Sequence, residues 1–263
     1  MASTSINPDR VVPALTRRTV LGSGLGILSC PALAQMPQRS CRGDIWLTID
    51  TGSMAAADEI ATLLQRYSIR ASFFLANERT ITSDRSLEGR WWDYWRARAA
   101  EGHAFASHTW RHWYLRADRQ DGRIDYIAWG GGQREALDRA AFLAELERPA
   151  ERFAAETGSR MVRLWRAPGG RTTPRALAWA ESAGWRHIGW TPAGFLGDEL
   201  DSDRFPNSQL LAQALRRIGP GDILVMHTGI WDRKDPFIKV FEPLLQGLLH
   251  RGLCFRALNE AVP

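Results

Sequence analysis

Long apolar runs are absent from this sequence. Its 263 residues are 44% apolar, the usual content of a soluble protein with a packed core. No stretch reaches the roughly 18 consecutive apolar residues that suggest a membrane-crossing helix, so no stable membrane insertion is expected after processing. Internal repeats, low-complexity tracts and a clear interdomain linker are missing too, which argues against repeat architectures.

Strong charge is also lacking. The formal net charge is +5. Three arginines and one aspartate place +2 of it in residues 1–34, which leaves +3 on the remainder. A charge this small and evenly spread does not predict a nucleic-acid partner.

Cysteine is scarce, with only Cys30, Cys41 and Cys254 in the chain. Cys30 lies in a segment that we expect to be removed, which leaves an even pair. Such a pair can form a disulfide in an oxidising compartment. Cys41 precedes the first expected strand and Cys254 lies in the last, so the two could meet if these strands are neighbours. Two buried free thiols are the alternative.

The first 34 residues have the features of an export signal. Arg17 and Arg18 precede a short apolar, glycine-rich run, and residues 32–34 (Ala-Leu-Ala) suit a signal peptidase. The arginine pair is typical of a twin-arginine signal. We therefore expect residues 1–34 to be a signal peptide, residues 35–263 to form one domain, and the protein to be periplasmic or secreted. A disordered tail is the alternative.

A recurring pattern organises the remaining chain: a short apolar run, a polar residue at its end, then a segment of helical length. The expected strands are 45–50, 71–77, 103–108, 162–168, 187–191, 223–227 and 254–258. The expected helices are 55–67, 91–101, 133–157, 174–183, 208–218 and 237–251. Pro149 is expected to break or kink the third helix, and residues 114–132 form a long polar insertion. Alternating strands and helices predict an α/β fold with about seven parallel strands closed into a barrel.

Four polar residues fall at or near the ends of the expected strands: Asp50, His108, Arg166 and His227. Chemistry in such barrels gathers at the carboxyl ends of the strands, so these side chains are expected to converge. Asp50 suits a metal ligand or general base, and a fixed Arg166 could hold it ionised. His227 could protonate a leaving amine. The alternatives are a helix N-cap for Asp50, a surface position for Arg166 and a core position for His227.

The segment His108-Thr109-Trp110-Arg111-His112 sets two imidazoles four residues apart. On a helical turn, this spacing places both on one face, near enough to share a metal ion. The alternative is a pair of partly buried histidines packed against nearby tryptophans.

Taken together, these segments resemble the NodB-type polysaccharide deacetylases, carbohydrate esterase family 4, over residues 44–258. The matching motifs are Thr48–Gly52, His108–His112, Arg166–Pro168 and Val225–His227, in family order, and the strand Ala71–Phe74 is also similar. The resemblance implies a distorted (β/α) barrel, a divalent metal such as zinc, and N-deacetylation of amino sugars in a polysaccharide such as peptidoglycan or an exopolysaccharide.

The resemblance also implies roles for single residues. His108 and His112 would ligate the metal, Asp50 would be the general base steadied by Arg166, and His227 would be the general acid. The backbone near Gly169 could help to hold the oxyanion.

Three departures from the family pattern affect these roles. Thr51 stands where the family has its third metal ligand, a carboxylate, and a neutral hydroxyl binds a cation less well. Gly169 replaces a usual aromatic residue, and the family's Asp-x-x-Asp-Trp motif is not recognisable near residues 190–195. Glu78, just past the second strand, is a candidate for the missing carboxylate. These departures leave open a non-catalytic glycan-binding relative, and a hydrolase of another amide or ester is a further alternative.

Tryptophan is abundant, with 12 residues. An indole can stack on the apolar face of a sugar ring. Trp110, Trp190 and Trp231 lie near the expected strand ends and are candidate substrate contacts, with core packing as the alternative.

Overall fold

The computed structural model describes residues 41–258, so the expected signal peptide lies outside the described residues. The main strands are β1 (Gly43–Asp50), β2 (Ser72–Leu75), β3 (Ala104–Ser107), β7 (Leu164–Trp165), β8 (Arg186–His187), β9 (Ile223–His227) and β10 (Leu253–Arg256). The helices are α1 (Ala57–Arg66), α2 (Trp91–Ala100), α3 (Arg139–Thr157), α4 (Pro174–Ser182), α5 (Asn207–Arg217) and α6 (Ile238–His250), with a short 3-10 turn at Pro168–Gly170. None of the helices in residues 41–258 has the length and apolar character needed to cross a membrane.

The seven main strands form one curled parallel sheet in the order β10-β1-β2-β3-β7-β8, with β9 also paired to β1. This arrangement confirms the expected α/β class and the distorted barrel. Strand β1 is at the centre because it pairs with β10 along its first half and with β9 along its second half. Its residues Ile45, Leu47 and Ile49 are fully buried in the core that also contains the apolar residues of α1 and α6, as expected for a strand covered on both faces.

The barrel closes through an irregular segment rather than a regular strand pair. Beyond β8, the Thr191 N–H donates to Ile223 O (3.1 Å) and the Val225 N–H donates to Gly194 O (3.0 Å). Phe195 forms an isolated parallel bridge with Val225. Residues 191–195 therefore join the β8 side of the sheet to β9, and we call this junction the seam.

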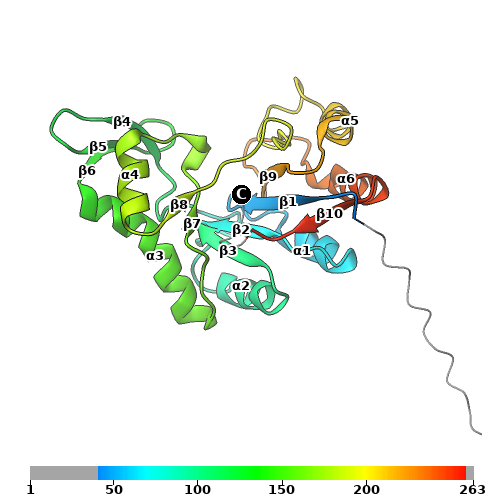
Figure 1. Ribbon diagram of the computed structural model, residues 1–263, viewed down its shortest axis with the longest axis horizontal. Coiled ribbons are helices and arrows are strands. Elements are labelled where there is room, and N and C mark those ends of the chain that lie inside the picture. The colour runs from blue at the N-terminus through cyan, green and yellow to red at the C-terminus, as the bar shows by residue number, and fades with distance from the viewer. Residues whose placement is uncertain (1–40, 259–263) are drawn as a thin grey trace, which may run out of the picture. The chain divides into compact units, whose positions relative to one another are not determined.

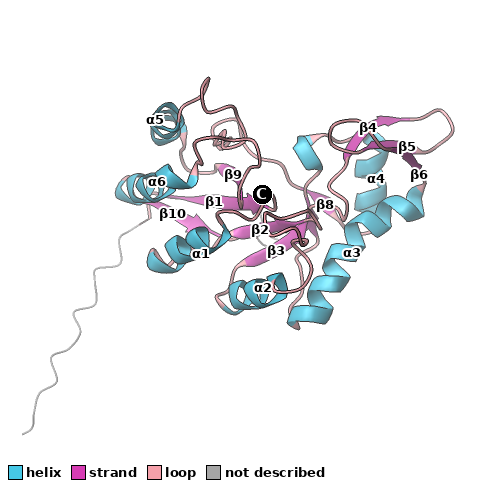
Figure 2. Ribbon diagram, turned by 180° about the vertical axis from the view of Figure 1, so that it is seen from behind, coloured by secondary structure: helices cyan, strands magenta, loops and turns pink. Residues whose placement is uncertain are grey.

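Helix α1 buries one apolar stripe in the core that also contains β1. On α1, Ile60, Leu63 and Leu64 are buried at spacings of three and four residues, which is the pattern of an amphipathic helix. Figure 1 shows α5 and α6 at one end of the sheet, and α3 and α4 at the other. Figure 2 shows the same arrangement from behind.

The polar insertion is ordered, and part of the expected third helix belongs to it. A second, antiparallel sheet consists of β4 (Tyr114–Asp118), β5 (Ile124–Ile127) and β6 (Arg134–Leu137). The expectation of a helix from residue 133 was therefore wrong for 134–137, and α3 begins at Arg139, after Asp138 caps it through the Ala141 N–H (2.8 Å). Pro149 does not interrupt α3, which runs through it to Thr157.

Cys41 and Cys254 form a disulfide, with their Cα atoms 5.6 Å apart. The first and last strands are neighbours, and Asp44 of β1 lies opposite Cys254 of β10. The pairing therefore follows from the position of the two strands, and the alternative of two free thiols does not hold in the structure.

Candidate active site

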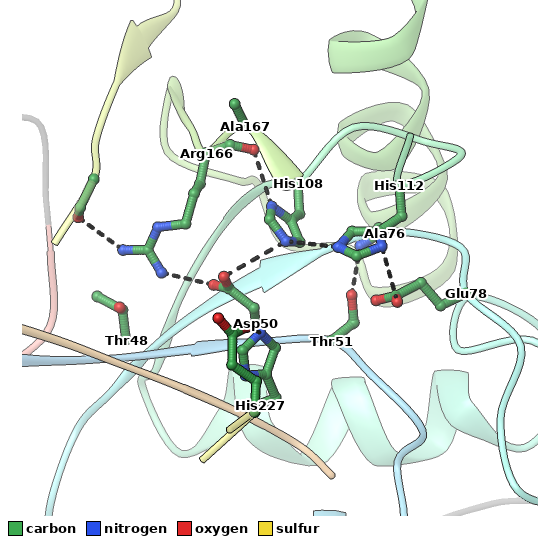
Figure 3. A network of polar contacts seen from close by, with 12 residues as sticks. Thr48, Asp50, Thr51, Ala76, Glu78, His108, His112, Arg166, Ala167 and His227 are labelled. Carbon is green, nitrogen blue, oxygen red and sulfur yellow. Dashed lines mark hydrogen bonds and ion pairs between the residues drawn. The ribbon is translucent and has the colours of Figure 1, made fainter. Parts of the chain in front are cut away.

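The four residues expected at strand ends do converge (Figure 3). Asp50 ends β1 and His227 ends β9, and the two lie opposite each other in the pairing of these strands. His108 directly follows β3, and Arg166 directly follows β7, which pairs with β3. Parallel pairing brings these carboxyl ends to one edge of the sheet and so assembles the site.

Asp50 is a buried carboxylate held ionised by Arg166. The Arg166 guanidinium donates from Nη1 to Asp50 Oδ1 (2.7 Å), from Nη2 to Gly189 O (3.0 Å) and from Nε to Ile188 O (3.3 Å). Burial by itself raises the pKa of Asp50, but Arg166 and the nearby imidazoles outweigh it and hold that pKa below its usual range. Arg166 is itself fully buried, so the alternative of a surface arginine is excluded.

His108 is oriented as a neutral imidazole. Its Nδ1 lies 2.9 Å from Arg166 O, and a carbonyl oxygen only accepts, so Nδ1 carries the hydrogen. The lone pair is therefore on Nε2, which lies 3.5 Å from Asp50 Oδ2. Burial lowers the pKa of His108 to about 3, which keeps the ring neutral and available as a ligand.

The loop 108–112 brings the two histidines together without a helical turn, contrary to the expectation from their spacing. Thr109 and His112 both have left-handed backbone conformations, with φ of 64° and 57°. Such conformations are costly outside glycine and require support. Arg111 provides it by donating to both carboxylate oxygens of Glu145 on α3, from its backbone N–H (2.9 Å) and its Nε (2.7 Å).

The two imidazoles approach each other through Nε2, with 3.1 Å between these atoms. On the opposite side of the His112 ring, Nδ1 lies 3.1 Å from Glu78 Oε1. A carboxylate accepts from Nδ1, so in the neutral form of His112 both Nε2 atoms present lone pairs to the same point. Neutral lone pairs at this distance repel, and a cation between them removes the repulsion. The pair therefore fits a divalent metal bound by two imidazoles.

A third strong ligand is not assembled beside this pair. The Thr51 hydroxyl accepts a hydrogen bond from the Ala76 N–H (3.0 Å). In the described part of the chain, no aspartate or glutamate oxygen completes a set of three ligand atoms mutually within 4.8 Å with the two imidazoles. Glu78, considered from the sequence as a substitute ligand, approaches Nδ1 of His112 rather than the shared point. The candidate metal-binding set is thus two imidazoles with a hydroxyl nearby.

His227 has a carboxylate partner that the sequence did not reveal. Asp198 accepts from the backbone N–H of His227 (2.7 Å) and lies 3.2 Å from its Nδ1, while Glu199 lies 3.8 Å from its Nε2. Burial alone lowers the pKa of His227, but Asp198, Asp50 and Glu199 outweigh burial and raise it to about 10. His227 is therefore a charged imidazolium at neutral pH, with Asp198 as its main partner.

Gly169 leaves room for an aromatic side chain from another element. A Cβ at Gly169 would lie 2.8 Å from the ring of Tyr114, and its φ is +60°. Tyr114 begins β4, so the antiparallel sheet supplies an aromatic ring beside the position where the sequence lacks one.

The three candidate tryptophans occupy different surroundings. Trp110 packs against the main core and carries the Arg148 guanidinium 4.1 Å from its ring centre, so this face is not open to a sugar. Trp190 covers Gly170, where an added Cβ would lie 2.8 Å from the indole. Trp231 follows β9 and is 54% exposed, so its indole is free to contact a ligand.

Comparison with known families gives a match over most of the barrel. The family model described as polysaccharide deacetylase matches residues 38–188. An uncharacterised 30.6 kDa protein of Geobacillus stearothermophilus is 24% identical over 222 residues, which is 83% of this chain and 71% of that protein.

Solved structures of carbohydrate esterase family 4 share the fold. A family 4 carbohydrate esterase from Streptomyces lividans, in complex with acetate, aligns with a TM-score of 0.59 and 19% identity, covering 84% of this chain and 99% of that chain. A peptidoglycan N-acetylglucosamine deacetylase aligns with a TM-score of 0.62 and 17% identity, covering 82% and 86%. A family pseudoenzyme from Bacillus anthracis aligns with a TM-score of 0.60 and 17% identity, covering 84% and 66%.

Proposed function

The chain belongs to the polysaccharide deacetylase family, and from this premise we propose that it is a metal-dependent hydrolase that removes acetyl groups from N-acetylated amino sugars. The observation that carries the proposal is the convergence of two Nε2 lone pairs beside an ionised Asp50 and a protonated His227. A general base and a general acid of this kind are what hydrolysis of an acetamide requires.

We propose Zn²⁺ as the metal, held by His108 and His112, with the Thr51 hydroxyl as a weaker third contact. When bound, such a cation polarises the acetamide carbonyl and makes water more acidic. The proposed substrate is peptidoglycan or an exopolysaccharide, and the proposed location is the periplasm or the cell exterior. The disulfide between Cys41 and Cys254 supports an oxidising compartment.

The protein residues divide the proton transfers between them. Asp50 Oδ1 is occupied by Arg166, so Oδ2 is the oxygen that accepts a proton from the attacking water. As the water oxygen bonds to the acetyl carbon and the C–N bond breaks, His227 gives its Nε2 proton to the leaving nitrogen. The products are acetate and a free amine. Asp198 on Nδ1 holds the His227 ring in place and favours its charged form.

A second candidate function is glycan binding without catalysis. It is favoured by Thr51, whose hydroxyl already accepts from the Ala76 N–H and brings no negative charge to a cation. Under this alternative, the barrel edge binds a polymer through Trp190 and Trp231.

One experiment separates the two functions. Bound metal and acetate release from N-acetylglucosamine oligomers are measured for the mature wild-type chain, Asp50→Asn, His108→Ala and the exposed control His250→Ala on α6. We expect metal in wild type, Asp50→Asn and His250→Ala but not in His108→Ala. Loss of the general base should reduce the rate about 10²–10⁴-fold. A wild type without metal, and with no more acetate than Asp50→Asn, would overturn the proposed hydrolase and favour the binding function instead.

A further inference from the structure

Glu78 is a poorly satisfied carboxylate next to the histidine pair. Its side chain is 16% exposed, and its Oε2 is buried without a hydrogen-bond partner in the described residues. Its other oxygen, Oε1, lies 3.1 Å from His112 Nδ1. A buried carboxylate oxygen without a donor is costly unless positive charge lies close by. The presence of a glutamate at this position therefore needs an explanation.

The backbone of Glu78 is fixed before its side chain reaches His112. The Glu78 N–H donates to Ser86 Oγ (3.0 Å), and the Ser86 N–H donates back to Glu78 O (2.9 Å). Trp95 on α2 in turn donates from its indole N–H to Ser86 O (2.7 Å). The loop between β2 and α2 is thus fastened to a helix, and Glu78 approaches His112 from a rigid support.

The contact decides which nitrogen of His112 can face His108. In the neutral ring, donation from Nδ1 to Glu78 places the lone pair on Nε2, and Nε2 is the atom 3.1 Å from His108 Nε2. Without Glu78, the ring is free to exchange tautomers or to rotate. Partners that accept from the outer nitrogen of a metal-binding histidine fix its orientation and raise its basicity.

We propose that Glu78 is a positioning residue of the metal centre, which fixes His112 with Nε2 toward the metal and brings to the centre the negative charge that Thr51 lacks. The inference rests on the proposed function, since it assumes a cation between the imidazoles. Figure 3 shows the alignment it requires: Glu78, His112 and His108 follow one another, with Glu78 on the far side of His112. Glu78 touches neither substrate nor metal in this arrangement.

The test compares Glu78→Met with wild type and with Glu88→Gln. Methionine keeps approximately the length of the side chain but removes both its charge and the oxygen that accepts from His112 Nδ1. Glu88 is an exposed residue of the same loop, which accepts from Asn77 Nδ2 (3.0 Å), and a glutamine oxygen can still accept there. Zn²⁺ affinity is measured by calorimetry with a competing chelator. The tautomer of His112 is measured by ¹⁵N NMR in metal-free protein, and thermal unfolding in EDTA checks that all three chains fold.

We expect Glu78→Met to bind Zn²⁺ about 10–100-fold more weakly than wild type, and its metal-free His112 to lose its preference for hydrogen on Nδ1. Glu88→Gln should match wild type in both. Affinity of Glu78→Met within twofold of wild type, or an unchanged His112 tautomer, would overturn the inference. A wild type that binds no Zn²⁺ would overturn the proposed function, whereas the tautomer measurement would still decide the role of Glu78.

Discussion

Asp198 sets the charge of His227, the proposed general acid. Its carboxylate accepts from the backbone N–H and lies beside the Nδ1 of His227, so it favours the imidazolium over the neutral ring. His227 thus holds a proton over the whole neutral range.

Replacing this carboxylate should weaken the general acid at high pH. In Asp198→Asn, the pKa of His227 should fall from about 10 toward its ordinary range, because a neutral amide no longer stabilises the positive charge. The alkaline limb of acetate release should then move to lower pH. Proton NMR titration of His227 and a pH profile of kcat measure the two effects.

Asp203→Asn is the matched control, since Asp203 lies in the same loop region and pairs with exposed Lys234 rather than with His227. An alkaline limb of Asp198→Asn that coincides with those of wild type and Asp203→Asn would contradict this role.

Site residues were predictable from the sequence where they stand at the carboxyl end of an expected strand. Asp50, His108, Arg166 and His227 stand at or just past strand ends, so parallel pairing alone brings them together. Asp198 could not be found in this way because no strand precedes it directly: it follows the irregular seam, and only the closure of the barrel carries it to His227. An acidic pair, Asp198-Glu199, was the sole signal in the sequence.

Among the elements, the loop 108–112 depends most on its surroundings. Two left-handed residues shape it, and Glu145 of α3 holds it through Arg111 while also accepting from the Tyr126 hydroxyl (3.0 Å). The geometry of the histidine pair therefore depends on how α3 packs.

Glu145→Gln should loosen this loop. A glutamine offers one acceptor oxygen where the carboxylate accepts on two, and the charge opposite Arg111 is lost. The free energy of unfolding should fall by about 1.5–3 kcal/mol, and Zn²⁺ affinity should fall about tenfold as His112 becomes less fixed. Urea denaturation and calorimetry measure these changes.

Glu156→Gln, on the same helix, removes only an exposed pair with Arg152, and should cost well under 1 kcal/mol. If the two variants were equally stable, Glu145 would not be the support of the loop.

Strands and helices of the barrel followed from hydrophobic pattern, but the antiparallel sheet did not. Residues 134–137 read Arg-Glu-Ala-Leu, all good helix formers, and the preceding insertion alternates only weakly. Pairing with β5 and packing against α3 and α4 override that preference. This is the usual way in which tertiary contacts outweigh local propensity.

For the molecule as a whole, the disulfide joins residues 213 positions apart. A cross-link restricts the unfolded chain more as its loop grows. The double variant Cys41→Ser/Cys254→Ser should therefore lose about 2–5 kcal/mol of unfolding free energy. Its activity at 25 °C should persist, because the bond lies at the amino end of β1 and the site lies at the carboxyl end.

Urea denaturation with and without reductant tests this. Reductant should lower the stability of wild type toward that of the double variant and leave the variant unchanged. Equal stabilities of oxidised wild type and variant would show that the cross-link does not stabilise the fold.

The number and direction of the barrel strands were predictable, since each apolar run alternates with a helix. The way the barrel closes was not, because residues 191–195 carry no regular strand pattern. A Cβ at Gly194 would lie 1.9 Å from Ile223 O, so backbone contact at the seam requires a residue without a side chain there.

The seam also makes folding a proton-consuming event. Asp198 lies just beyond the seam on one side and His227 ends β9 on the other, so the two meet only when the barrel is shut. An unfolded histidine has a pKa near 6.5, whereas that of His227 in the barrel is about 10. Between these values, the shut barrel binds a proton that the open chain has released. By linkage, the stability from this contact is fully present below about pH 6.5 and is lost as the pH rises through about 10. A rise in pH through about 10 therefore weakens the Asp198–His227 contact that helps to close the barrel, and it removes the proton from the proposed general acid at the same time.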